Sequence, residues 1–197
     1  MKMYRAVPKA AALAASKTYT ASASRRTPSN VPYLVDNVWE FLRPGHAPSR
    51  RHAVYASPSP ELALQNASAV GADPDLYVVC EIVAESADLL IAHLPVTDAR
   101  LHEDVGRILR YVAQAQGPHF ASLPLEQKAV HAALYLPGTS TEELVTYLNR
   151  SVHGQGLRKE LRDLSTFWKD AKYSQQSHNG ELFFEVKAGG SYQLKPL

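Results

Sequence analysis

The sequence has 197 residues, of which 45% are hydrophobic and 20% are charged, and its formal net charge is +2. This length and composition suit one compact globular domain that buries a core without disulfide bonds. The small net charge argues against bulk attraction to nucleic acid or to a membrane surface. No apolar run approaches the roughly 18 residues of a membrane-spanning helix, so a cytoplasmic protein without a membrane partner is expected.

The first half of the chain predicts short strands and helices separated by Pro, Gly or polar stretches. In chain order we expect a strand at 3–7, a helix at 10–16, a loop at 17–29, a helix at 32–42, a strand at 53–56, a helix at 60–68 and strands at 76–83 and 87–93. The run at 76–83 is apolar and β-branched on both faces up to Glu81, which predicts a central strand.

The second half predicts a block of amphipathic helices, followed by two strands. The helices are expected from residue 97 or 98 to about 114, at 125–136, from 140 to about 150, and at 156–173. In the strand at 180–186, Leu182, Phe184 and Val186 share the core face. A Gly-Gly turn then predicts that the strand at 192–194 pairs back with it as a hairpin.

This order of elements lacks the regular strand–helix alternation of a parallel sheet. It predicts an α+β fold with a mainly antiparallel sheet, in a single domain over residues 1–197. The helical insertion covers about residues 97–173.

Several common catalytic patterns are absent from the sequence. It has no glycine-rich phosphate loop, no HExxH metal motif and no Gly-x-Ser-x-Gly element, and its one cysteine excludes a cysteine-pair metal site. The eight histidines are scattered, so no metal is expected.

Polar side chains with suitable chemistry occur on or beside three predicted strands. Arg5 is on the first strand, Ser57 ends the strand at 53–56, and Glu181 and Glu185 are on the strand at 180–186. An arginine suits phosphate oxygens, and a serine can orient a carboxylate or a sugar hydroxyl. The alternatives are an ion-paired surface arginine, an ordinary strand–helix turn at Ser57, and glutamates on the solvated face of an edge strand.

Three segments in this order are MYRAV, VYASPSPELAL and HNGELFFE, which contain Arg5, Ser57 and Glu181. In this arrangement the chain resembles the ADP-ribosyltransferase superfamily, in its arginine–serine–glutamate branch. The resemblance covers both ends of the chain and residues 52–65, but not the helical block. It implies the antiparallel split sheet of that superfamily, with NAD as co-substrate and no metal.

The resemblance also implies roles for individual residues. Arg5 would contact the pyrophosphate or ribose phosphate of NAD, Ser57 would position Glu181, and Tyr55 would stack on the nicotinamide. Glu181 would hydrogen-bond the ribose 2′-hydroxyl and stabilise the oxocarbenium-like state. Arg51, with its neighbour Arg50, would extend the phosphate contacts, and a surface role for this pair is the alternative.

The sequence departs from the pattern of arginine-modifying members just before Glu181. They carry a glutamate two residues before the catalytic one, where this chain has Asn179, so a different acceptor is expected there. Glu185 is also an alternative to Glu181 as the catalytic residue, although Glu181 follows the loop directly and is preferred.

The leading hypothesis is a mono-ADP-ribosyltransferase that modifies a protein or nucleic acid. It would be a bacterial or phage effector or toxin, delivered to a target cell in some cases and paired with an immunity protein or antitoxin. An NAD glycohydrolase on the same fold is one alternative. A non-catalytic protein that binds a partner through its helical block is another, favoured if the glutamates are buried in ion pairs.

Overall fold

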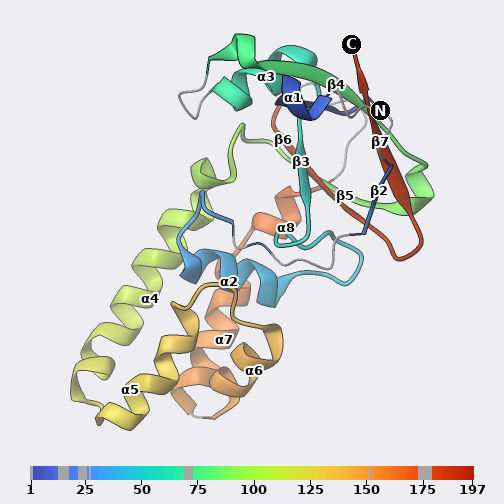
Figure 1. Cartoon of the computed structure of the whole chain (residues 1–197). Coiled ribbons are helices and arrows are strands. Elements are labelled where there is room, and N and C mark those ends of the chain that lie inside the picture. The colour runs from blue at the N-terminus through green and yellow to red at the C-terminus, as the bar shows by residue number, and fades with distance from the viewer. Residues whose placement is uncertain are drawn as a thin grey trace. The chain divides into compact units, whose positions relative to one another are not determined.

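The computed structural model describes residues 2–12, 18–21, 26, 28–68, 73–150, 152–172 and 179–197 (Figure 1). The chain forms two compact units. The sheet unit comprises Met1–Ser24, Gly45–Asp98 and Ala171–Leu197, and the helical unit comprises Arg25–Pro44 and Ala99–Asp170. The predicted α+β class and antiparallel pairing are confirmed. The helical block expected at about 97–173 corresponds to most of the helical unit, which also includes the helix predicted at 32–42.

The sheet unit contains a four-stranded antiparallel sheet. Its order is β1 (Tyr4–Pro8), β4 (Tyr77–Val83), β7 (Ser191–Pro196) and β2 (Thr18–Thr20). β4 pairs with β1 on one side and β7 on the other, which confirms its predicted central position.

A second antiparallel sheet has three strands, visible as β3, β6 and β5 in Figure 1. β6 (Glu181–Val186) lies in the middle, between β3 (Val54–Ala56) and β5 (Leu89–Leu94). The two sheets meet at an isolated bridge between Tyr4 and Ser57, where each backbone N–H donates to the other carbonyl at 2.9 and 2.8 Å.

The core of the sheet unit collects apolar side chains from both sheets. Its buried members are Met3, Ala56, Ile82, Leu89, Leu182, Phe184, Val186 and Tyr192. The prediction that alternate residues of β6 share the core face is therefore confirmed. Burial of each large side chain contributes roughly 1.5–3 kcal/mol, so this face fixes the register of β6 against its neighbours.

Short helices complete the sheet unit. They are α1 (Lys9–Ala12), α3 (Pro60–Ser68), η1 (Pro74–Leu76) and η2 (Ser86–Asp88). α3 packs against β1 and β4, and its first turn is capped by Ser59 Oγ, which accepts from Leu62 N–H at 3.2 Å. The predicted bounds of this helix are confirmed.

The described part of the helical unit contains α-helices and short 3₁₀ helices (labelled η). They are α2 (Tyr33–Leu42), η3 (Ala99–Leu101), α4 (Glu103–Ser122), α5 (Leu125–His131), η4 (Ala132–Leu134), α6 (Thr141–Asn149), α7 (Val152–Leu164) and α8 (Phe167–Asp170). α2 packs against α4, α6 and α8, and α7 packs against α4 and α6. Within the described ranges, no helix is both long and apolar enough to cross a membrane.

The predicted hairpin between the last two strands is wrong. β6 pairs with β3 and β5, whereas β7 pairs with β4 and β2. Both edges of β6 are occupied, so the turn at Gly189 and Gly190 carries the chain to the other sheet. Gly189 has a φ of +82°, a conformation that favours glycine.

The predicted bounds of the long helix α4 are also wrong. Its N-cap is His102 rather than residue 97 or 98, because His102 Nδ1 accepts from Asp104 N–H at 3.2 Å. The helix continues past Gln114 and through Pro118. Beyond the predicted end, buried Gln116 donates to Tyr147 Oη at 2.9 Å, which ties this part of α4 to α6.

The helix predicted at 156–173 is interrupted between α7 and α8. Ser165 Oγ and Thr166 N–H donate to the Asp104 carboxylate, at 2.6 and 3.1 Å. This carboxylate caps the start of α8 as a separate helix. The helix predicted at 125–136 likewise changes to a 3₁₀ turn at η4.

Part of the predicted loop at 17–29 forms a strand, β2. Tyr19 stacks on Tyr192 of β7 with ring centroids 4.9 Å apart, so a partner distant in sequence stabilises this strand. Residues 13–16 of the predicted first helix, and residues 173–178 before Asn179, lie outside the described residues.

Candidate functional site

The three sequence motifs meet where the two sheets join. Ser57 directly follows Ala56, which pairs with Leu182, and Glu181 directly precedes Leu182. Ser57 is also bridged to Tyr4, the residue before Arg5. Strand pairing therefore brings the backbones of Arg5, Ser57 and Glu181 to one end of β3 and β6.

Glu181 lies on the buried, central strand of its sheet. Its exposed fraction is 6%, and the strand is paired on both sides, so the alternative of a solvated edge strand is wrong for this residue. Glu181 Oε1 is 3.7 Å from Nη1 of Arg50. The side chains in this ion pair are 8% and 1% exposed, respectively.

Two aromatic rings surround the Arg50 guanidinium. Its Cζ is 5.5 Å from the ring centroid of Tyr55 and 5.7 Å from that of Phe183. Phe183 is two residues from Glu181 on the same face of β6, so the arginine covers both the ring and the carboxylate. Cation–π attraction of this kind is about 0.5–2 kcal/mol and increases with desolvation.

Glu185, on the same face of β6, binds the segment that carries Arg50. Its Oε2 accepts from the backbone N–H of Ser49 at 2.7 Å. Ser49 in turn accepts from Arg51 N–H at Oγ (3.3 Å) and from His52 N–H at its carbonyl (3.1 Å). These contacts give Glu185 an anchoring position and leave Glu181 as the carboxylate nearest the other motifs.

Arg51 is buried beside Arg50, with exposed fractions of 1% and 2%. The predicted alternative of a surface role is therefore wrong for both residues. Burial of the Arg51 guanidinium also does not favour its predicted contact with an NAD phosphate. Tyr55, the predicted nicotinamide ring partner, is partly exposed, and its hydroxyl donates to the Arg50 carbonyl at 3.3 Å.

The side chain of Ser57 is directed to α3. Its Oγ accepts from Asn66 Nδ2 at 3.0 Å, and the residue is 3% exposed. A role of Ser57 in positioning Glu181 stays a prediction. The Asn66 contact was not predicted, although Asn66 lies two turns into the helix that Ser57 precedes.

The segment before Glu181 is held by β5 and by the residues that follow it. His93 Nε2 lies 2.6 Å from the carbonyl oxygen of Asn179, and Glu181 N–H donates to the Val96 carbonyl at 2.8 Å. Asn179 itself is exposed, as a residue that meets an acceptor would be. His93 was among the scattered histidines of the sequence, and only the pairing of β5 with β6 reveals this contact.

Replacing Gly180 with alanine is expected to destabilise the sheet unit by roughly 2–4 kcal/mol. Its φ is +109°, and an added Cβ would lie 2.0 Å from the Leu94 carbonyl oxygen and 2.9 Å from His93 Nε2. The measurement is hydrogen exchange of the β6 amides. Gly189→Ala is the matched control, because its φ is also positive but a Cβ meets nothing within 4 Å. If both variants lose the same protection from hydrogen exchange, the expected collision of the added Cβ with the Leu94 carbonyl is contradicted.

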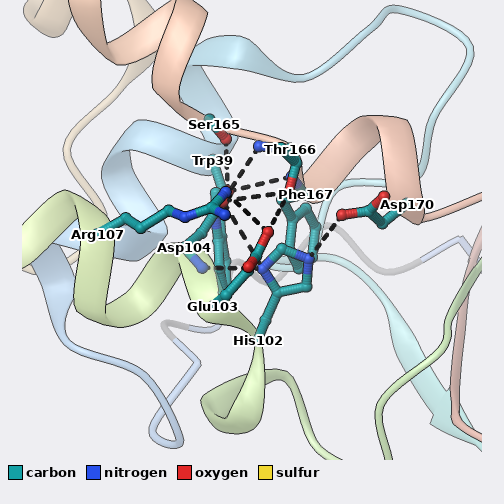
Figure 2. A network of polar contacts seen from close by, with 9 residues as sticks. All are labelled: Trp39, His102, Glu103, Asp104, Arg107, Ser165, Thr166, Phe167 and Asp170. Atoms are coloured by element: carbon teal, nitrogen blue, oxygen red, sulfur yellow. Dashed lines mark hydrogen bonds and ion pairs between the residues drawn. The ribbon is translucent and has the colours of Figure 1, made fainter.

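A separate polar cluster in the helical unit surrounds Asp104 (Figure 2). Asp104 Oδ2 accepts from Trp39 Nε1 at 3.0 Å, from Ser165 Oγ at 2.6 Å and from Phe167 N–H at 3.1 Å. Thr166 N–H donates to Oδ1. Burial raises the pKa of Asp104, but these hydrogen bonds outweigh it, so the pKa lies below its usual value. This carboxylate thus links α2, α4 and α8 and has a structural role.

His102 and a second buried cluster extend the polar interior of this unit. His102 Nε2 is 3.3 Å from Asp170 Oδ2, beside the Phe167 ring. Where α6 meets the end of α5, Tyr147 Oη lies 2.6 Å from Nδ1 of buried His131, and burial is the main cause that raises the pKa of Tyr147 to about 12. Among the described residues, no group of three or more His, Cys, Asp and Glu side chains is arranged to hold a metal ion.

Comparison with known proteins assigns no family to the chain. No family model matches the sequence, and no similar curated protein or solved structure was found. The candidate site therefore depends on the residues of this chain alone.

Proposed function

We propose that the chain is an NAD-dependent mono-ADP-ribosyltransferase that modifies a macromolecular acceptor. The observation that most supports this function is the meeting of the motifs that contain Arg5, Ser57 and Glu181. Two backbone hydrogen bonds join Tyr4 to Ser57, and the Ala56–Leu182 pair brings Ser57 beside Glu181 in the sheet. These contacts connect segments that are far apart in the sequence, in the order that the superfamily resemblance implies.

The proposed reaction breaks the bond between C1′ of the nicotinamide ribose and the pyridinium nitrogen. The bonding electrons leave with nicotinamide, which becomes neutral, and positive charge develops on the ribose. Glu181 stabilises this charge and accepts a hydrogen bond from the 2′-hydroxyl. A nucleophile on the acceptor then bonds to C1′ and releases its proton to solvent.

Other residues would bind NAD or recognise the acceptor. Arg5 would bind phosphate oxygens, and the partly exposed Tyr55 would stack on the nicotinamide. The exposed Asn179 would contact the acceptor next to the reacting sugar. Its amide both donates and accepts hydrogen bonds, so it suits a protein side chain or a nucleic-acid base. A toxin or effector of this kind would have an immunity protein or antitoxin as a further partner.

The test is incubation of the purified chain with NAD labelled in its adenylate part, with and without a cell lysate. We expect nicotinamide release together with transfer of label to protein or nucleic acid. Nicotinamide release without transfer in any lysate would instead identify an NAD glycohydrolase. Absence of NAD binding by calorimetry, together with no turnover, would refute both enzymatic functions.

A second candidate function is non-catalytic binding of a partner through the helical unit. The burial of Glu181 in an ion pair with Arg50 favours it, because such a pair can simply be structural. Under this alternative, Glu181→Gln would change stability, and NAD would have no effect on the thermal midpoint. NAD-dependent stabilisation of the wild-type chain would contradict the alternative, because a ligand stabilises only the state that binds it.

A further inference from the structure

We propose that Arg50 is the positioning residue for Glu181: it keeps this carboxylate ionised and fixes its orientation toward the reacting ribose. This inference rests on the proposed function, since it assigns a role in the same reaction. Arg50 was predicted only as a phosphate contact or as a surface residue. Its place beside Glu181 follows from the tertiary structure.

The burial of the pair is the first reason for this role. The side chain of Glu181 is 8% exposed and lies on the same strand as the buried ring of Phe183. Its carboxylate has therefore lost most of its hydration. Such a group takes up a proton unless an opposite charge or hydrogen bonds compensate. A protonated Glu181 carries no charge with which to stabilise a cationic ribose. The guanidinium of Arg50, 3.7 Å from Oε1, supplies the compensating charge.

The restraint on Arg50 is the second reason. Its guanidinium lies against Tyr55 from β3 and Phe183 from β6, and its carbonyl accepts from the Tyr55 hydroxyl. The preceding residue, Ser49, is held by Glu185. Arg50 is therefore held from two strands of the sheet, which fixes the direction from which it meets Glu181.

Other charged or titratable groups lie near Glu181 and must be separated from the effect of Arg50. Glu185 is two positions beyond Phe183 and accepts from Ser49 N–H, and His93 from β5 lies against the Asn179 carbonyl. Arg5 lies one residue beyond the Tyr4–Ser57 bridge, and Arg51 is buried next to Arg50. Because its Nη1 lies 3.7 Å from Glu181 Oε1, Arg50 is the cation whose removal tests the charge on Glu181 directly.

The catalytic test compares Arg50→Gln with Arg50→Lys across pH, by nicotinamide release. Removal of the positive charge is expected to shift the acidic limb of the pH profile of kcat to higher pH by about 1–3 pH units. The effect on KM is expected to be smaller. At pH values below the acidic limbs of both proteins, Arg50→Gln is then slower than wild type by about 10–10³-fold, and the difference narrows as pH rises. Lysine keeps the charge without the planar fork, so Arg50→Lys should restore most of the acidic limb.

Arg110→Gln is the matched control, because it removes the same group from an exposed position on α4. It should leave the pH profile unchanged. An Arg50→Gln profile that superimposes on wild type would overturn the proposal. A loss that is equal at every pH and is not restored by lysine would also overturn it, because that result indicates a role in packing alone.

A readout without NAD keeps this inference separate from the proposed function. The Glu181 carboxyl can be titrated by ¹³C NMR, with Glu181→Gln used to assign its signal. We expect its titration midpoint to rise in Arg50→Gln relative to wild type, and an unchanged midpoint would overturn the role of Arg50. If the wild-type chain never turns over NAD but this midpoint rises, the proposed function fails while the electrostatic coupling stands.

A stability comparison covers the case in which Arg50→Gln folds poorly. Urea unfolding near neutral pH should show that Arg50→Gln/Glu181→Gln is more stable than Arg50→Gln. The single variant buries the Glu181 carboxylate without the positive charge of Arg50, whereas the double variant has no carboxylate at that position. If the loss caused by Arg50→Gln is the same in both backgrounds, the two residues are not coupled and the proposal is wrong.

Discussion

Replacing Glu181 with glutamine is expected to lower the rate of nicotinamide release roughly 10²–10³-fold, which is the usual effect of losing one preorganised electrostatic contact in a transition state. The amide has nearly the same shape but carries no charge, so stabilisation of the cationic ribose is lost. Because that interaction strengthens only as the glycosidic bond breaks, kcat should fall much more than KM rises. The measurement is steady-state release of nicotinamide with NAD as the only substrate.

Glu185→Gln is the comparison for this prediction. Glu185 Oε2 accepts one backbone hydrogen bond from Ser49 at 2.7 Å, and the carbonyl oxygen of a glutamine can still accept it. A loss of less than about tenfold is therefore expected from this variant. If activity survives Glu181→Gln and is abolished in Glu185→Gln, Glu185 is the catalytic residue. Thermal unfolding of both variants separates lost chemistry from lost structure.

Replacing Asp104 with asparagine is expected to destabilise the helical unit by about 2–4 kcal/mol, because hydrogen bonds to a buried carboxylate are lost and a buried donor is left unsatisfied. Five donors, including Trp39 Nε1 and Ser165 Oγ, converge on its two oxygens. An amide nitrogen in place of either oxygen would face these donors and leave at least one of them unsatisfied. Both tryptophans of the chain, Trp39 and Trp168, lie in the helical unit, so urea unfolding followed by tryptophan fluorescence reports on this unit.

The same carboxylate predicts a pH dependence of stability. The pKa of Asp104 is lowered in the folded state, so its contribution is fully present above the unfolded value, about 3.9. That contribution decreases as pH falls through the folded pKa, because the unfolded chain takes up the proton first. Wild type should therefore lose more stability than Asp104→Asn when urea unfolding is repeated at decreasing pH below about 4.

Glu103→Gln is the matched control for the Asp104 predictions. Glu103 is the neighbouring residue, and its side chain is 55% exposed in an ion pair with Arg107 at 2.7 Å. An exposed pair at this spacing contributes about 0.3–0.5 kcal/mol, so only a small change is expected. Similar losses in Glu103→Gln and Asp104→Asn would show that the hydrogen bonds to Asp104 are not the cause.

Local sequence patterns were sufficient to predict the elements whose stability is local. The helix at 60–68 follows from Ser59, Pro60 and a first-turn glutamate, and α6 follows the N-cap Ser140, which forms a capping box with Glu143. Alternation in β6 likewise identified Leu182, Phe184 and Val186 as core residues. Each of these features depends on groups a few residues apart, so the local pattern contains the information.

The pairing of segments that are distant in sequence is visible only in the folded chain. β7 follows β6 in the chain but pairs with β4 and β2, because β6 already has a partner on each edge. Asp104 divides α7 from α8 across some sixty residues of sequence, through hydrogen bonds to Ser165 and Thr166. Arg50 meets Glu181 only because β3 pairs with β6. These contacts depend on strand pairing, burial and charge compensation between remote residues, for which local periodicity carries no signal.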